Sequence, residues 1–126
     1  MVLIRKFEDI VAWQEARKLV NQVYQLTNTG GLSKDFGMRD QLQRAAISVM
    51  NNIAEGFDCE SNLEFARFLV IARRSTVEIQ SMLYAAHDIG YIDEKIHKEL
   101  YLQAAKTKTL INALKHSLKI STQKTP

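Results

Sequence analysis

The stretch Gln41-Leu-Gln-Arg-Ala-Ala-Ile-Ser-Val-Met-Asn-Asn-Ile-Ala-Glu-Gly-Phe57 is the part of this chain that predicts the fold most directly. Its apolar residues recur at steps of three and four, the pattern of a helix with one buried face: Leu42, Ala45, Val49 and Ile53. A polar set recurs at the same steps about one residue out of phase, roughly 100° around the helix: Gln41, Arg44, Ser48, Asn52 and Glu55. This polar stripe contains no lysine, so we expect it to bond to other parts of the protein.

The same periodicity predicts a helix on the N-terminal side of this stretch. It runs from about Glu8 to Asn28 and ends before the pair Gly30-Gly31. Its predicted buried residues are Trp13, Ala16, Val20, Val23 and Leu26 or Thr27. The helix of the polar stripe then begins near Asp35 and ends near Gly56.

Two further helices are predicted on the C-terminal side. Ser61-Asn-Leu-Glu64 has the pattern of a capping box, and the helix that it starts ends at about Ile89, before Gly90. Its inward residues are Phe65, Phe68, Leu69, Ala72, Thr76, Ile79 and Leu83. Asp93 is the predicted N-cap of a last helix that reaches about Ile120. That helix buries Ile96, Leu100, Leu110 or Ile111, Leu114 and Leu118, and Gln103 and Thr107 interrupt its apolar stripe.

These four helices predict an all-α fold. The only proline is Pro126, and no segment has the alternation of a strand. Amphipathic helices with short connections pack as an up-down-up-down four-helix bundle. We expect one domain over residues 1–120 and a frayed C-terminal tail over residues 121–126.

Composition excludes several classes of protein. No apolar run approaches the roughly 20 residues of a membrane span, so no membrane partner is expected. The single cysteine, Cys59, leaves no intrachain disulfide and fits a reducing cytoplasm. Acidic Asp58 and Glu60 flank this cysteine and oppose its use as a nucleophile.

The sequence predicts no enzyme, catalytic residue, metal or cofactor. Glu94 and His97 have the spacing of a di-iron motif, but that site needs two such motifs and two more glutamates. No nucleophile elbow or glycine-rich phosphate loop is present in the sequence.

The polar stripe predicts a network of Arg44, Asn52, Glu55 and Glu78. A tight turn after the stripe puts Glu78 opposite about residue 39, and Arg44 leans toward it, so we predict a buried ion pair between Arg44 and Glu78. Asn52 and Glu55 are interpreted as a clamp on the start of the next helix. The alternative is that these two residues contact a ligand or another subunit.

Basic residues concentrate at the C-terminal end. Of the 17 Lys and Arg and 14 Asp and Glu residues, five lysines and none of the acids fall in residues 100–126. Four of these lysines, Lys106, Lys108, Lys115 and Lys119, are candidate contacts to RNA or DNA. The alternative is that they only complement the dipole at a helix C-terminus.

Several segments in one order resemble the bacterial family of 23S rRNA intervening-sequence proteins. They cover roughly residues 7–92 and comprise Phe7-Glu-Asp-Ile-Val-Ala-Trp-Gln14, Gln41-Leu-Gln-Arg-Ala-Ala-Ile-Ser48, Asn52-Ile-Ala-Glu-Gly56, Glu64-Phe-Ala-Arg-Phe-Leu69, Ser75-Thr-Val-Glu-Ile79 and Asp88-Ile-Gly-Tyr-Ile92. The chain departs from the family at Arg74, where glycine is frequent, and at Met50-Asn51, where Pro-Ser is common.

The resemblance implies a left-handed bundle that assembles into a homopentamer around a central channel, without an established enzyme activity. A related bundle, the accessory protein of diversity-generating retroelements, is similar in assembly and binds nucleic acid through a basic surface. Analogy of fold therefore implies a cytoplasmic homo-oligomer that binds RNA or DNA. The alternative is a protein-recruitment module without a nucleic-acid role.

Overall fold

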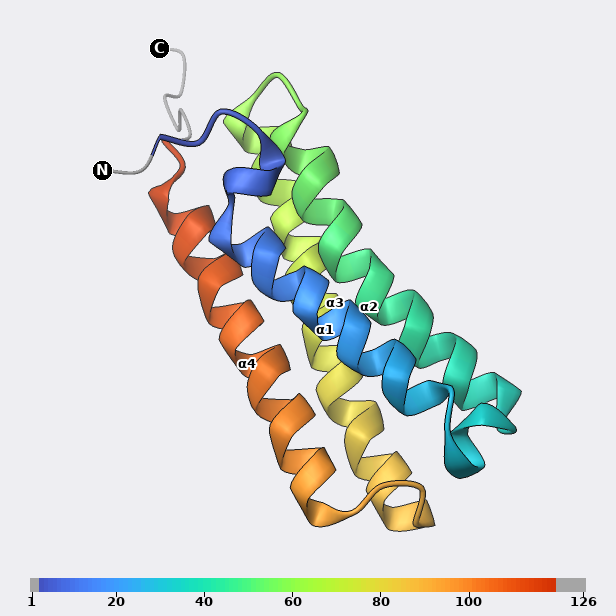
Figure 1. Ribbon diagram of the computed structural model, residues 1–126. Coiled ribbons are helices and arrows are strands. Elements are labelled where there is room, and N and C mark those ends of the chain that lie inside the picture. Colours follow the sequence, from blue (N-terminus) through green and yellow to red (C-terminus); the bar gives the residue numbers. More distant parts are fainter. Residues whose placement is uncertain (1–2, 120–126) are drawn as a thin grey trace.

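A computed structural model describes residues 3–119 as four long α-helices (Figure 1). The helices are α1 (Val11–Thr27), α2 (Phe36–Phe57), α3 (Asn62–Ile89) and α4 (Glu94–Ser117). Short 3-10 turns, η1 (Phe7–Asp9) and η2 (Gly30–Ser33), precede α1 and α2. No strand occurs within residues 3–119, so the predicted all-α class is confirmed. The expected tail, residues 121–126, lies outside the described range, as do residues 1, 2 and 120 of the expected domain.

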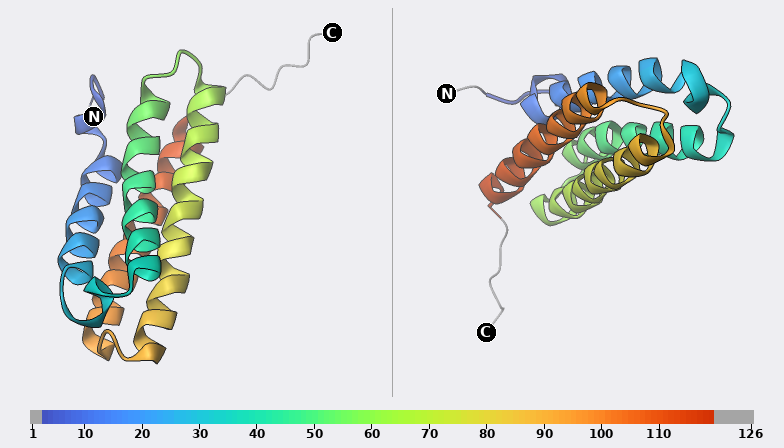
Figure 2. Two further views of the ribbon diagram at one scale, coloured as in Figure 1. Left: turned by 90° about the vertical axis from the view of Figure 1, so that its right-hand side faces the viewer. Right: turned by 90° about the horizontal axis from the view of Figure 1, so that it is seen from below.

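The helices alternate in direction, and each packs against two neighbours. Helix α1 lies against α2 and α4, and α3 lies against the same two helices. The connections from α1 to α2 and from α3 to α4 lie at one end of the bundle, and the connection from α2 to α3 lies at the other (Figures 1 and 2). This is the predicted up-down-up-down arrangement.

Side-chain caps start three of the helices, and two of these caps, Ser61 and Asp93, are the predicted ones. Each cap oxygen accepts a backbone N–H bond: Asp35 from Met38 at 3.1 Å, Ser61 from Glu64 at 3.1 Å, and Asp93 from Ile96 at 2.8 Å. Helix α3 ends at Gly90, which adopts a left-handed conformation with φ of 96° that suits glycine. Only one of the two hydrogen bonds of the predicted capping box forms. The Ser61 backbone N–H does not donate to the Glu64 carboxylate within the described residues.

The predicted start of the first helix at Glu8 is wrong. The Asp9 carboxylate accepts hydrogen bonds from the backbone N–H groups of Arg5 at 3.0 Å and Lys6 at 3.3 Å, which holds a separate 3-10 turn. Ile10 is extended, with φ of −77° and ψ of 119°, and α1 begins after it. The Asp9 carboxylate therefore stabilises this separate turn in place of an N-terminal extension of α1.

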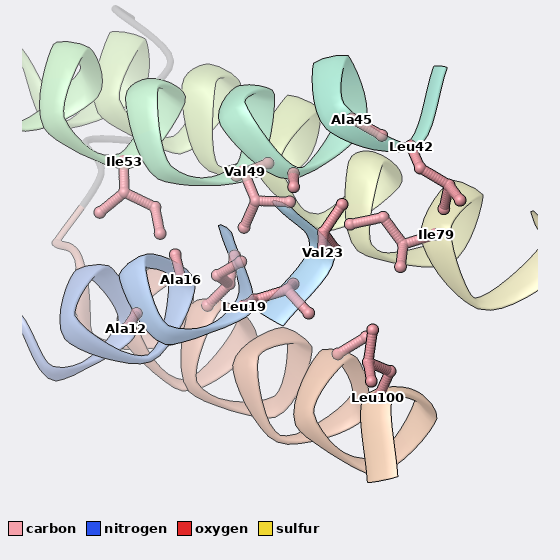
Figure 3. Close-up of a cluster of buried hydrophobic side chains, with 14 of the residues drawn as sticks. Ala12, Ala16, Leu19, Val23, Leu42, Ala45, Val49, Ile53, Ile79 and Leu100 are labelled. Atoms are coloured by element: carbon pink, nitrogen blue, oxygen red, sulfur yellow. The ribbon is translucent and has the colours of Figure 1, made fainter. Parts of the chain in front are cut away.

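The core lies between all four helices (Figure 3). The predicted α2 face is confirmed, since its four apolar residues are at most 3% exposed. The predicted α1 face is rotated from the observed one: Leu19 is fully buried, whereas Trp13 and Val20 are only half-buried. The reason is that α1 packs against both α2 and α4, so its buried face is centred on Leu19.

Helices α2 and α3 approach closely at Gly56. A Cβ atom at this position would lie 2.7 Å from Cβ of Phe68 and 2.8 Å from Cδ1 of Phe65. Any larger residue would push the two helices apart. This contact fixes the end of the α2–α3 seam, along which the polar stripe runs.

Candidate functional site

The polar stripe of α2 meets α3 through neutral groups. The Ser75 hydroxyl donates to Oγ of Ser48 at 2.8 Å and joins the two helices. Asn52 donates from Nδ2 to the carbonyl oxygen of Ser48 at 2.8 Å and to its Oγ at 3.0 Å. Asn52 and Ser48 therefore do form an interhelical network, and its third member is Ser75, which the sequence reasoning did not single out.

Arg44 and Glu78 lie at the rim of this seam. They share a hollow of about 160 Å³, which is lined by Gln41, Arg44, Ala45, Ser48, Ser75 and Glu78. The contact between Ser48 and Ser75 shifts the register from the predicted one, so that Glu78 is level with Arg44.

The predicted buried ion pair between Arg44 and Glu78 is wrong. Both residues are exposed, and no N–O distance between them reaches 4.0 Å within the described chain. Exposed charges gain little from pairing in water, because solvent screens them and holding two long side chains costs entropy. The hollow therefore presents a guanidinium and a carboxylate that are not bonded to each other.

The predicted clamp at the α2–α3 junction is also wrong. Glu55 is exposed, and its backbone oxygen accepts from the Cys59 thiol at 3.4 Å. Ser61 supplies the cap of α3, while Asn52 bonds back within its own helix. Ser61 thus provides a local acceptor at the start of α3, and Glu55 does not cap that helix.

Within residues 3–119, the environment of the free cysteine does not activate it, and no metal-binding cluster is found. Partial burial and the carboxylates of Glu64, Asp58 and Glu55 raise the pKa of the Cys59 thiol, which disfavours the reactive thiolate. No group of three or more His, Cys, Asp or Glu side chains in this range could hold a metal ion. No helix in the same range is both long and apolar enough to cross a membrane.

A buried acid joins α1 to α4. The side chain of Glu15 is 8% exposed, and its Oε1 lies 3.1 Å from Nε2 of Gln103 and 3.3 Å from Nζ of Lys106. Its Oε2 lies 3.0 Å from Nζ of Lys18. The Gln103 amide and the Lys18 and Lys106 ammonium groups lower the pKa of Glu15 to about 2. Within the described residues, Lys106 therefore already pairs with an acid of this chain, unlike the other candidate lysines.

The sequence reasoning missed Glu15, although a signal was present. Gln103 was recognised as an interruption of the apolar stripe in α4. Glu15 interrupts the buried face of α1, between Ala12 and Ala16, in the same way. Interruptions on two helices that pack together indicate a shared buried polar cluster.

Two of the remaining candidate lysines, Lys108 and Lys115, belong to α4 and by helical spacing lie on the side of it that faces α3. The rings of Tyr84 on α3 and His97 on α4 lie 4.7 Å apart, so these two residues are level with each other along the seam. Arg73 stands three turns before Tyr84, and Lys108 stands three turns after His97, so Arg73 and Lys108 are level on the same side of the seam. Lys115 follows two turns after Lys108 on the same side of α4. We call Arg73, Lys108 and Lys115 the basic seam.

The basic seam has no acidic partner within residues 3–119. None of its three side chains forms an ion pair in that range. Helix α4 has no acid after Glu99, and the one acid of α3 between Glu64 and Asp88 is Glu78, which lines the α2–α3 hollow instead. Lys119 lies at the end of the same seam, where its carbonyl oxygen accepts from Nδ2 of Asn62 at 2.9 Å.

Four aromatic rings continue the seam beyond its basic part. His97 packs against Tyr84, against Tyr101 at 5.8 Å and against His87 at 5.5 Å, and Tyr84 meets Tyr101 edge to face at 5.7 Å. Tyr84 remains 52% exposed. The neighbouring Tyr101 phenol raises the pKa of Tyr84, so the ring stays neutral. The sequence reasoning missed this cluster, because its members come from two helices.

A second hollow, of about 350 Å³, lies between α1 and α4. Its lining contains no basic side chain and comprises Gln22, Gln25, Leu26, Thr29, Ile96, Glu99 and Leu100. Glu99 would repel a phosphate, so this hollow does not suit a polyanion.

Comparisons with known proteins agree with this architecture. Residues 8–113 match the family described as 23S rRNA-intervening sequence protein. Among curated proteins, none matches this chain. The fold is similar to the crystal structure of a protein of unknown function from the S23 ribosomal protein family of Bacteroides thetaiotaomicron, with a TM-score of 0.79 and 18% sequence identity. That match covers 85% of this chain and 96% of the other. Since the family match spans most of the bundle, the chain belongs to the 23S rRNA-intervening sequence protein family.

Proposed function

We propose that this protein is a non-enzymatic homo-oligomeric scaffold that binds RNA or DNA through the basic seam, without sequence preference. The observation that carries the proposal is the basic seam itself. Arg73, Lys108 and Lys115 line one side of α3 and α4 without an acidic partner in the described chain. Binding to phosphates by such side chains is sequence-tolerant, because the phosphate backbone is the same for every sequence.

Two further arginines of α3 support the proposal. Arg67 and Arg74 are exposed, and neither forms an ion pair within residues 3–119. The net charge of the whole chain is only +3, while residues 100–126 contain five lysines and no acid, so positive charge is concentrated in the segment that includes Lys108 and Lys115.

The test is fluorescence anisotropy with a labelled RNA across a series of salt concentrations. The triple variant Arg73→Gln, Lys108→Gln, Lys115→Gln should weaken binding and flatten the dependence on salt, because fewer counterions are released. The matched control replaces Lys34, Lys95 and Lys98, which are exposed and form no ion pair within residues 3–119. An unchanged salt slope in the triple variant would refute the basic seam as the binding surface.

Assembly into a ring is part of the same proposal. A closed ring with an odd number of subunits needs two different faces on each subunit. Exposed large apolar side chains occur on different helices, which suits such a head-to-tail contact: Val11 and Tyr24 on α1, Phe36 on α2, Ile71 and Val77 on α3, and Leu102 on α4.

Light scattering tests the assembly. A homopentamer should have about five times the 14.4 kDa mass of the chain. A monomer at micromolar concentration would refute the ring. If that monomer also failed to bind nucleic acid at low salt, the protein-recruitment alternative would replace the whole proposal.

A further inference from the structure

We propose that Tyr84 is a stacking site for an unpaired base, so that the ligand of the basic seam is single-stranded nucleic acid. This inference rests on the proposed function, because it specifies the form of nucleic acid that the same surface takes. It would make the α3–α4 seam a two-part site, with one part for phosphates and one for a base.

Tyr84 has the properties of a stacking platform. Its side chain is 52% exposed, so one part of the ring is open to solvent. The rest of the ring is held by His97 at 4.7 Å and by Tyr101 at 5.7 Å, with an interplanar angle of 72° to Tyr101. A ring that is already held by neighbours loses little conformational entropy when a base stacks on it.

The platform and the basic seam lie on one line. Lys108 follows Tyr101 by two turns, about 10 Å, and Arg73 precedes Tyr84 by three turns, about 16 Å. Val77, which is 42% exposed, lies between Arg73 and Tyr84 on α3. An extended strand can therefore place phosphates beside Arg73 and Lys108 and a neighbouring base on Tyr84.

The exposed ring favours a single strand over a duplex. In a duplex both faces of every internal base are covered by stacking, so only its phosphates could reach this surface. Unpaired bases offer free faces, and aromatic side chains accept any of them without reading the sequence. The arrangement thus keeps the expected lack of sequence preference and adds a preference for strandedness.

The central experiment compares Tyr84→Ala with wild type in anisotropy titrations of oligo(U) and of a duplex of equal length. Loss of one stacked base should weaken oligo(U) binding about 5- to 100-fold and leave duplex binding unchanged. The salt slope should stay the same, because the number of neutralised phosphates does not change. Leu63→Ala, at an apolar residue of the same helix that is 48% exposed, is the matched control and should bind like wild type.

Two more variants and a crosslink keep the test independent of folding defects in Tyr84→Ala. Tyr84→Phe should retain affinity, and Tyr84→Trp should raise it, because the larger ring offers more stacking surface. Ultraviolet irradiation with 5-bromouracil in the oligonucleotide should crosslink Tyr84, as read by mass spectrometry.

The outcomes separate this inference from the proposed function. If the basic-seam variants lose binding while the Tyr84 variants bind oligo(U) like wild type, the stacking site is refuted and the phosphate surface stands. If Tyr84→Ala instead lowers the mass in light scattering and leaves affinity unchanged, Tyr84 belongs to a contact between subunits and the inference is overturned. If wild type binds no nucleic acid at low salt, both proposals fall.

Discussion

The seam between α1 and α4 and the seam between α2 and α3 use polar residues in opposite ways. Between α1 and α4, a carboxylate that is 8% exposed is surrounded by Lys18, Gln103 and Lys106. Between α2 and α3, the bond that crosses the seam is neutral and joins Ser48 to Ser75, while charged Arg44 and Glu78 remain in solvent.

The difference shows which polar residues of a helical bundle contribute to its stability. Glu15 interrupts an apolar face, so its charge is buried and must be satisfied by partners. The stripe of Arg44 and Glu55 lies beside an apolar face, so its charges reach water and need no partner. Position relative to the apolar face, rather than the regularity of the polar pattern, therefore separates structural from surface residues.

The largest expected effect comes from removing the buried acid. Glu15→Ala should lower the free energy of unfolding at pH 7 by about 3 kcal/mol, because the bonds of Gln103, Lys18 and Lys106 to a nearly buried carboxylate are lost and Gln103 keeps only its bond to the Glu15 carbonyl oxygen. Urea melts measure this value. Glu60→Ala, at an exposed acid, is the control and should stay within about 0.5 kcal/mol of wild type. A similar result for both variants would remove the distinction between the two seams.

Acid should weaken the α1–α4 seam in a defined range. The pKa of Glu15 is lowered from 4.5 to about 2 in the folded chain, so its contribution is complete above pH 4.5 and is lost as pH falls toward 2. Between these values wild type should lose about 2 kcal/mol more stability than Glu15→Gln, which carries no titrating group there. Parallel curves of stability against pH for the two proteins would contradict the depressed pKa.

The sequence predicted the helices better than it predicted their polar contacts. Caps at Asp35, Ser61 and Asp93 act locally, within three residues, so they can be recognised without knowing the fold. The register between helices depends on packing, and the shift that placed Ser48 beside Ser75 could not be computed from turn length alone. The bond from Gln103 to Glu15 joins residues 88 positions apart, so only the interruptions of two apolar stripes could indicate it.

The candidate lysines of α4 differ in which neighbouring helix they face. Lys106, Lys108 and Lys115 look alike in sequence, but Lys106 faces α1 and pairs with Glu15, whereas the other two face α3. Arg73 joins them only because α3 and α4 run antiparallel. A basic cluster built from two helices needs the register of both, which the sequence did not supply.

The close approach of α2 and α3 at Gly56, rather than pairing of charges, should stabilise the α2–α3 seam. Gly56→Ala should destabilise the protein by about 1–2 kcal/mol, because the new Cβ would meet Cβ of Phe68 at 2.7 Å. Gly37→Ala, near the other end of the same helix, meets only Oδ1 of Asp35 at 3.8 Å and should stabilise by up to about 1 kcal/mol. Thermal melts of the two variants should therefore shift in opposite directions, and equal shifts would contradict the close contact.

The smallest expected effects concern the rim and floor of the α2–α3 hollow. Ser75→Ala removes the bond across the seam and should cost about 1 kcal/mol. Arg44→Ala and Glu78→Ala should each cost less than about 0.5 kcal/mol, because both charges are exposed and unpaired with each other. Urea melts of the double variant should equal the sum of the single ones, since groups that do not interact contribute independently. A coupling above about 0.5 kcal/mol would show that Arg44 and Glu78 do interact in solution, and the contrast between the two seams would then be one of degree.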